Sequence, residues 1–200
     1  MKVKPDVPAG RGLRLDAARN QERILRAAAG AFEQLGPAAS LEEVARRAGV
    51  GVATVYRRFG SREQLVRAVF AHLFATEIEP ATAATTDDPW HDLAAALEAT
   101  IAAAVAHRVL LRLAREAGAI DLDTVQRYLG HLERLLGRAR EAEQVRPELE
   151  PRDMTAAVVM VLATVRRGEP AAPGADWRRY LALLLDGMRP AATPLPTRTR

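Results

Sequence analysis

Apolar residues recur every three or four positions along most of the chain, which is the period of an amphipathic helix. The first stripe predicts a helix over about residues 16–35, and Gly36-Pro37 ends it. Ser40 and Ser61 each stand three residues before a Glu or Gln, the spacing of a helix N-terminal capping box. The pattern therefore predicts four helices in the first third of the chain, over about 16–35, 40–48, 51–59 and 61–74.

The polar stretch 80–89, PATAATTDDP, predicts a loop. Beyond it apolar stripes return, and we expect helices over 90–106, 107–117, 122–142, 151–167 and 176–188. The tail 190–200 has no periodicity, and we expect it to be disordered. Alanine occurs 40 times and aromatics make up only 4% of the chain, a composition that favours helices over strands. The predicted fold class is therefore all-α, with about nine helices.

The composition excludes several kinds of chemistry. There is no cysteine, so disulfides, thiol redox sensing and Cys-ligated zinc are excluded. The only serines, Ser40 and Ser61, are explained as helix caps, and the only lysines are Lys2 and Lys4. The four histidines are spaced without an i,i+4 pair. We therefore predict no enzyme, no catalytic residues, no metal and no cofactor.

Nothing in the sequence predicts export or membrane insertion. The start, MKVKPDVPAG, lacks the apolar segment of a secretory signal. The longest nearly unbroken apolar run, 156–165, is too short to cross a bilayer. We expect a cytoplasmic protein with no membrane partner.

Charge is distributed unevenly along the chain. Residues 1–70 hold 13 Lys and Arg against 7 Asp and Glu, a net of +6, whereas residues 71–200 have a net of −2. A basic first third indicates a local polyanion-binding surface. An Arg-rich composition with chance asymmetry is the alternative. Residues 1–15, with Lys2, Lys4, Arg11 and Arg14, are predicted to form a flexible basic arm that reaches a DNA minor groove or remains solvated.

Residues 41–60, LEEVARRAGVGVATVYRRFG, have the spacing of a helix-turn-helix. Ala45 is small where two helices cross, and Gly49 supplies the permissive backbone of a tight turn. Val55 is the apolar anchor that packs the third helix onto the second. In this motif the helix after the turn enters a DNA major groove. A plain αα-hairpin with a solvated arginine face is the alternative.

The third helix is expected to bury Val55 and Phe59, which leaves its other side chains to face outward. Short side chains at its start allow the backbone to approach a partner closely, and hydroxyl and guanidinium groups suit phosphates and base edges. Arg62 stands in the first turn of the next helix, where backbone amides favour an anion. The predicted DNA-binding residues are Gly51, Val52, Ala53, Thr54, Tyr56, Arg57, Arg58 and Arg62.

The stretch from residue 21 to residue 70 resembles the N-terminal domain of TetR/AcrR-type transcriptional regulators. The resemblance rests on I-L-x-A-A-x-x-x-F in the first helix, L-x-x-V-A-x-x-A-G-V in the second, and T-V-Y-x-x-F-x-S-[KR]-x-x-L in the third and fourth. It covers about a quarter of the chain. Gly51 replaces the Ser or Thr that usually caps the recognition helix, and Arg62 stands where the family more often has Lys for a phosphate.

The resemblance implies an all-helical homodimer that binds a palindromic operator in double-stranded DNA. It also implies a C-terminal domain that binds a small ligand and then releases the DNA. We expect a basic arm at 1–15, a DNA-binding domain at 16–75, a regulatory and dimerisation domain at 76–189, and a tail at 190–200. The expected function is a ligand-responsive transcriptional regulator, acting as a repressor.

Apolar positions between 90 and 142 suggest a pocket for a neutral or weakly amphipathic ligand, although each residue there could equally be core. The predicted ligand contacts are Leu97, Ile101, His107, Leu113 and Tyr128. Apolar stripes on helices 151–167 and 176–188 suggest a four-helix dimer interface, with packing inside their own domain as the alternative. The stripes comprise Met154, Ala157, Val158, Val161, Leu162 and Val165, and then Trp177, Tyr180, Leu181, Leu184, Leu185 and Met188.

Two other functions fit the sequence. One is a DNA-binding regulator that takes no small-molecule ligand. The other is a helical interaction module whose helix-turn-helix no longer binds DNA. Operator binding distinguishes a regulator from the helical interaction module. Release of the operator by a ligand distinguishes a ligand-responsive regulator from one that takes no ligand.

Overall fold

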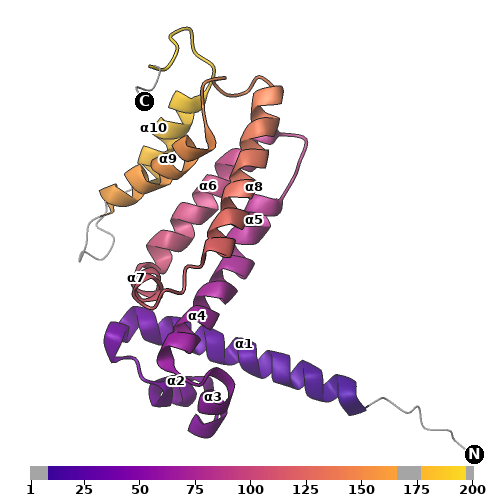
Figure 1. The fold of residues 1–200 in the computed structure, drawn as a ribbon, viewed down its shortest axis with the longest axis vertical. Helices are drawn as coiled ribbons and strands as arrows, with labels where there is room; N and C mark the ends of the chain where they lie inside the picture. The colour runs from indigo at the N-terminus through magenta and orange to yellow at the C-terminus, as the bar shows by residue number, and fades with distance from the viewer. Residues whose placement is uncertain (1–8, 166–176, 197–200) are drawn as a thin grey trace, which may run out of the picture. The chain divides into compact units, whose positions relative to one another are not determined.

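A computed structural model of the chain describes residues 9–165 and 177–196, with side chains from Asp16 onward. Within these residues the chain is helical and contains no strand (Figure 1). The α-helices are α1 (Ala9–Leu35), α2 (Leu41–Ala48), α3 (Val52–Phe59), α4 (Arg62–Leu73), α5 (Glu79–Ala83), α6 (Pro89–Ala106), α7 (Arg108–Glu116), α8 (Leu122–Glu141), α9 (Pro151–Thr164) and α10 (Trp177–Met188). The all-α prediction is confirmed.

The chain divides into two compact units. The N-terminal unit comprises Met1–His72 and Val109–Ala119, and the C-terminal unit comprises Leu73–Arg108 and Ile120–Arg200. The sequence predicts a domain boundary after residue 75, with all of 76–189 in one regulatory and dimerisation domain. The structure instead groups α7 with the first four helices.

Two sets of hydrogen bonds hold α7 in the N-terminal unit. The Glu33 carboxylate on α1 accepts from the backbone N–H groups of Val109 and Leu110, at 3.3 and 2.8 Å. These amides begin α7 and have no acceptor within their own helix. At the other end, Arg67 on α4 donates to the carbonyl oxygen of Gly118 at 2.6 Å. Such contacts between distant segments leave no periodic signal in the sequence.

The first helix is longer than predicted. It begins at Ala9 rather than near residue 16, although Gly10 and Gly12 both disfavour helix. Lys2 and Lys4 of the predicted arm lie outside the described residues, as do the side chains of Arg11 and Arg14. The buried stripe of α1, including Ile24, Ala28 and Phe32, packs against α2.

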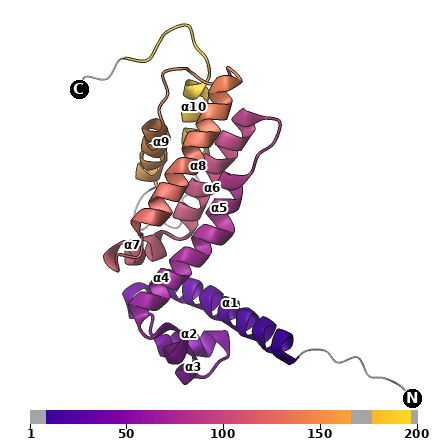
Figure 2. The ribbon, with the colours of Figure 1, turned by 45° about the vertical axis from the view of Figure 1, so that its right-hand side comes forward.

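The C-terminal unit is built around α6, α8, α9 and α10, which run side by side in Figures 1 and 2. Its core is dominated by leucine and other aliphatic side chains. Fully buried members are Leu93, Leu97, Ile101, Leu132, Leu135, Met154 and Val161. Residues 166–167 and 176 of the predicted helices lie outside the described residues, as do 197–200 of the tail.

The predicted loop at 80–89 is wrong for its first four residues. The chain continues from α4 through a π-helical turn, Phe74–Ile78, into α5, and only then forms a loop before α6. Pro80 is the second residue of α5, directly after the π-helical turn, and it has no backbone N–H to donate to that turn. The polar residue Thr82 is fully buried and donates to the carbonyl oxygen of Glu79 at 3.1 Å.

Most residues of the predicted dimer stripes on α9 and α10 face the core of their own unit and not solvent. Met154, Ala157 and Val161 are at most 1% exposed, and Trp177, Leu181 and Met188 are also buried. They belong to the unit's own core. The apolar residues exposed on these helices are mainly Val159, Met160, Tyr180 and Leu183. Single-sequence periodicity does not tell which partner covers an apolar stripe on α9, because most of the exposed side of that helix is apolar as well.

A buried ion pair joins the start of α6 to α8. Asp92 is 3% exposed and accepts from Arg138 at 2.5 Å, from the Thr86 hydroxyl at 2.7 Å and from the Thr86 amide at 2.9 Å. Burial raises the pKa of the Asp92 carboxyl, but the hydrogen bonds from Thr86 and Arg138 outweigh it, so its pKa lies below the ordinary value. The folded state therefore favours the ionised carboxylate.

We expect Asp92→Asn to lower the free energy of unfolding by about 2–3 kcal/mol, because Arg138 is left without its buried counter-charge. The folded pKa is depressed, so this stabilisation is complete above the unfolded pKa of about 3.9 and disappears as pH falls through the folded pKa. Urea unfolding from pH 7 down to pH 3 measures both effects. The control is Asp123→Asn, because the Asp123 side chain is 82% exposed where it pairs with Arg127. Equal destabilisation of the two variants would contradict this assignment.

No single described helix is long and apolar enough to cross a membrane, and only the bent pair α6 and α7 meets the requirements of length and composition jointly.

Candidate nucleic-acid interface

The turn between α2 and α3 is built by local interactions. The Ser40 hydroxyl accepts from the Glu43 amide at 3.2 Å and caps α2. Gly49 ends α2 in the left-handed region, with φ of +62°, where a side chain would be strained. The Val50 amide then donates to the Ala45 carbonyl oxygen at 3.0 Å, which closes the turn. The predicted helix-turn-helix backbone is therefore present.

Two buried anchors orient α3. Val55 is fully buried and Phe59 is 6% exposed, so this side of the helix packs into the N-terminal unit. The opposite side is open to solvent, as predicted. Thr54 is half-buried, whereas the exposed residues are Gly51, Val52, Ala53, Tyr56, Arg57 and Arg58. Gly51 caps α3 without a side-chain hydrogen bond, as its substitution for Ser or Thr predicts.

Charges on α2 and α3 are balanced differently. Glu43 accepts from Arg46 and Arg47 on its own helix, both at 2.6 Å. These hydrogen bonds lower the pKa of Glu43 to about 2, so its carboxylate is ionised at neutral pH. With Glu42, α2 carries two carboxylates against two guanidinium groups, and these charges compensate each other. On α3, Arg57 is exposed and Arg58 donates to the uncharged Gln21 of α1. The exposed face of α3 therefore keeps two positive charges.

Arg62 is the exception among the predicted contacts. Its guanidinium donates to the backbone oxygens of Ala39 and Gly36, at 3.1 and 3.2 Å. It also lies over the Phe32 ring, 5.4 Å from the centroid. These contacts tie the start of α4 to the segment that connects α1 and α2. They give Arg62 a structural role at the position where the sequence predicts a phosphate contact.

We expect Arg62→Lys to lower the free energy of unfolding by about 1–2 kcal/mol, because one ammonium cannot reproduce the two-pronged contact or stack as well on the ring. Urea unfolding followed by circular dichroism measures this decrease. The variant keeps its charge, so nonspecific DNA affinity should change little. Unchanged stability together with weaker DNA binding would return Arg62 to the DNA-contacting set.

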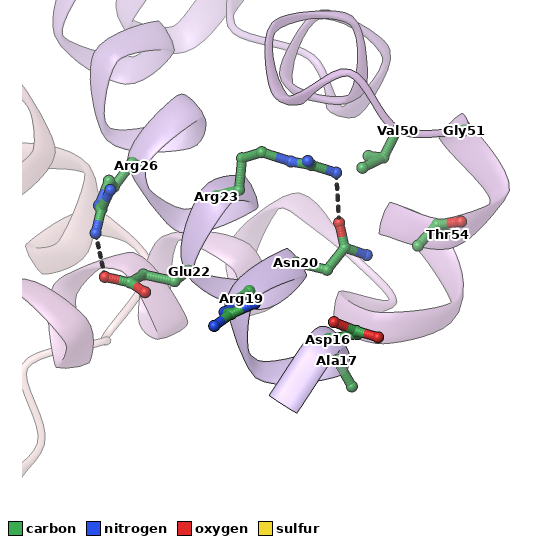
Figure 3. A pocket seen from close by; sticks show the side chains of 10 residues that line it. All are labelled: Asp16, Ala17, Arg19, Asn20, Glu22, Arg23, Arg26, Val50, Gly51 and Thr54. Atoms are coloured by element: carbon green, nitrogen blue, oxygen red, sulfur yellow. Dashed lines mark hydrogen bonds and ion pairs between the residues drawn. The ribbon is translucent and has the colours of Figure 1, made fainter. Parts of the chain in front are cut away.

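A groove of about 930 Å³ lies beside the start of α3 (Figure 3). Its walls come from α1, from the turn before α3 and from α3 itself. They comprise Asp16, Ala17, Arg19, Asn20, Glu22, Arg23, Arg26, Val50, Gly51 and Thr54. Arg23 donates to Asn20 at 2.9 Å, and Arg26 pairs with Glu22. Sequence reasoning missed Arg19 and Arg23, although Arg19, Arg23 and Arg26 recur at helical spacing and could have been recognised as one basic stripe.

The predicted ligand contacts are divided between the two units of the chain. Leu97 and Ile101 are fully buried in the core of the C-terminal unit, and Leu113 belongs to the N-terminal unit. Tyr128 donates to the Thr100 hydroxyl at 3.1 Å. The His107 Nε2 atom lies 3.1 Å from Glu77, and its buried Nδ1 has no hydrogen-bond partner among the described residues. No group of metal-ligating side chains is present in the part of the chain that the structure describes.

Comparisons with known proteins identify the family. The family described as "Bacterial regulatory proteins, tetR family" matches residues 24–69, which include α2, α3 and most of α4. A solved TetR transcriptional regulator from Streptomyces coelicolor is 32% identical, with 86% of this chain and 99% of that one covered and a TM-score of 0.68. The chain belongs to the TetR family.

Other solved structures are similar over almost their whole length. The regulator from Mycobacterium vanbaalenii is 29% identical, with 88% of this chain and 99% of that one covered and a TM-score of 0.67. A structure concerning the control of antibiotic production by a bacterial hormone is 25% identical, covers 85% and 95% of the two chains, and has a TM-score of 0.64. No curated protein matches the chain. This TetR-family protein is a DNA-binding transcriptional regulator.

Proposed function

We propose that this regulator represses transcription by binding a palindromic operator as a homodimer, and that a small molecule releases it. The observation that carries the DNA-binding part is the exposed face of α3, held outward by Val55 and Phe59. Its eight residues begin with short side chains, and two arginines precede the last residue, Phe59. A helix of this kind can enter a major groove with its first residues near the base edges.

The groove beside α3 supports an assignment of roles. The proposed base-reading residues are Val52, Ala53, Thr54 and Tyr56, because they lie within the first five positions of α3. Arg57, Arg58, Arg19 and Arg23 are proposed to hold the flanking phosphates. Guanidinium groups along a groove suit a sugar–phosphate strand better than a compact ligand, since the groove is open and three arginines line it.

A two-fold assembly follows from the proposed operator. A single recognition helix reads one half-site, and two half-sites lie about 34 Å apart on a palindrome. The exposed apolar residues Val159, Met160, Tyr180 and Leu183 on α9 and α10 support these helices as the dimer interface. Exposed apolar patches of this kind are often interaction surfaces.

Three observations bear on the small-molecule ligand. The relative concerned with control by a bacterial hormone supports a small molecule as effector. Within the C-terminal unit, the buried Nδ1 of His107 supports a polar contact beside the π-helical turn, where His107 Nε2 already contacts Glu77. Burial of Leu97 and Ile101 in the core instead favours the second candidate, a TetR-family regulator without a small-molecule ligand.

The test begins with operator selection from random duplex DNA by the full chain. Fluorescence anisotropy then compares the selected operator with a scrambled duplex at two salt concentrations. A thermal-shift screen of metabolites supplies ligand candidates, which are added to the protein–operator complex. Release by a stabilising compound supports the proposal, whereas compounds that stabilise the protein and never alter operator affinity support the second candidate. Failure to select any sequence would overturn both.

A further inference from the structure

A carboxylate lies beside the recognition helix. The Tyr56 hydroxyl on α3 donates to Glu42 Oε1 on α2 at 2.9 Å. Both residues are exposed, and Tyr56 has 46% of its surface open to solvent. The contact joins the two helices of the helix-turn-helix at the face that the proposed function turns toward DNA.

The contacts of Glu42 and Tyr56 favour one protonation state for each side chain at neutral pH. The pKa of the Glu42 carboxyl lies below its usual value, first because it accepts from its own backbone amide and then because Tyr56 and Ser40 donate to it. The pKa of the Tyr56 hydroxyl is raised, chiefly by its hydrogen bond to Glu42. At neutral pH the carboxylate is therefore ionised and accepts only, while the phenol keeps its single proton and donates it.

Because the Tyr56 hydroxyl donates its proton to Glu42, it can bind a further partner only as an acceptor. A phosphate oxygen is an acceptor, so it cannot receive the proton that Tyr56 already gives to Glu42. The negative charge of Glu42 also repels a nearby phosphate. The lone pairs of the hydroxyl remain free to accept. In the major groove the amino groups of adenine N6 and cytosine N4 are the donors that a side-chain acceptor can reach.

We propose that Glu42 is a positioning residue that fixes the Tyr56 hydroxyl as an acceptor, so that Tyr56 reads an adenine or cytosine amino group in the operator. The inference rests on the proposed function, because it requires α3 to lie in the major groove. It assigns Tyr56 to sequence specificity and not to phosphate binding. Glu42 acts through Tyr56 and touches no base.

Comparison with Glu63 shows that a position at a helix N-terminus does not by itself produce the hydrogen bond between Glu42 and Tyr56. Glu42 and Glu63 each stand two residues after a capping serine, at the second position of α2 and α4. Both have a lowered pKa, for which the backbone hydrogen bond is the first cause. Only Glu42 of these two also accepts from a tyrosine. Glu63→Gln therefore removes one negative charge from an equivalent position without touching Tyr56.

The experiment measures affinity of the full chain for the selected operator and for a scrambled duplex. In a series of operator probes, each adenine is replaced in turn by purine and each cytosine by 2-pyrimidinone, which deletes one amino group at a time. Tyr56→Phe, Glu42→Ala, Glu42→Gln and Glu63→Gln are compared with the unaltered protein. Gln is informative because its amide oxygen can still accept from Tyr56, whereas Ala cannot.

We expect one half-site position at which deletion of the amino group weakens binding of the unaltered protein by roughly fivefold and of Tyr56→Phe not at all. Tyr56→Phe should weaken operator binding and leave binding to the scrambled duplex unchanged. Glu42→Ala should lose the sensitivity to that amino group and bind scrambled DNA more tightly. Glu42→Gln and Glu63→Gln should keep the sensitivity.

Two outcomes would overturn the inference. One is an equal decrease in affinity for operator and scrambled DNA in Tyr56→Phe, which indicates a phosphate contact. The other is equal behaviour of Glu42→Gln and Glu42→Ala, which indicates that only the charge of Glu42 matters. Neither outcome affects the placement of α3 on DNA. That placement fails separately, if the arginines of α3 prove unnecessary for binding.

Discussion

Replacing both Arg57 and Arg58 with alanine should weaken operator binding about 100-fold, because two exposed guanidinium groups leave the end of α3. The decrease should extend to nonspecific DNA, since phosphates are present in every sequence. The slope of log K against log salt concentration should also become shallower by about 0.9 for each phosphate that is no longer neutralised. Anisotropy titrations from 50 to 300 mM salt, on operator and scrambled DNA, measure all three effects.

The control for charge is Arg112→Ala combined with Arg115→Ala. These two arginines are exposed on α7, in the same unit of the chain, so this variant removes the same charge from a different helix. We expect it to keep most of its operator affinity. Circular dichroism melting shows whether either variant is less stable than the unaltered protein. Unchanged operator affinity in the Arg57 and Arg58 variant would remove α3 from the DNA interface.

The helix-turn-helix could be predicted from the sequence almost residue by residue. Its boundaries depend on short-range rules: a serine hydroxyl caps α2, and Gly49 supplies the left-handed turn. The spacing from Ala45 to Val55 then fixes which side of α3 is buried. Interactions of this kind span at most a few turns of the chain, so the sequence carries them directly.

Contacts between distant segments could not be predicted in the same way. The carboxylate of Glu33 receives the first amides of α7, which lie more than 70 residues away. Arg62 resembles a phosphate contact in sequence, but it binds backbone oxygens of the connection between α1 and α2. A charged residue in a helix's first turn has the same local pattern in either role. Only the fold shows which acceptor is within reach.

The apolar helices of the C-terminal unit illustrate a second limit. On α9 the residues 154, 157 and 161 form one apolar stripe and 156, 159, 160 and 163 form another. Periodicity identifies both as apolar and does not rank them. The first stripe belongs to the unit's own core, and the second remains exposed. The sequence therefore predicts the two helices that carry the proposed dimer surface. Most of the residues that it names on them, however, pack in the unit's own core.

Val159→Glu combined with Leu183→Glu should convert the proposed dimer into a monomer. These side chains are 65% and 60% exposed in the single chain, so each tolerates a charge before assembly. In a dimer interface each glutamate would be buried without a counter-charge, at a cost of several kcal/mol for the pair. We expect sedimentation velocity at micromolar concentration to show a dimer for the unaltered protein and a monomer for the variant.

Operator affinity should fall with the dimer, because a monomer reads one half-site and forgoes the gain from joining two binding heads. Leu122→Glu is the matched control, since Leu122 is 71% exposed on α8 and lies outside the proposed interface. It introduces the same charge at an equally open apolar position and should remain dimeric. A variant that stays dimeric with both glutamates in place would exclude this face. A monomer that binds the operator as tightly as the unaltered protein would show instead that recognition does not depend on two-fold symmetry.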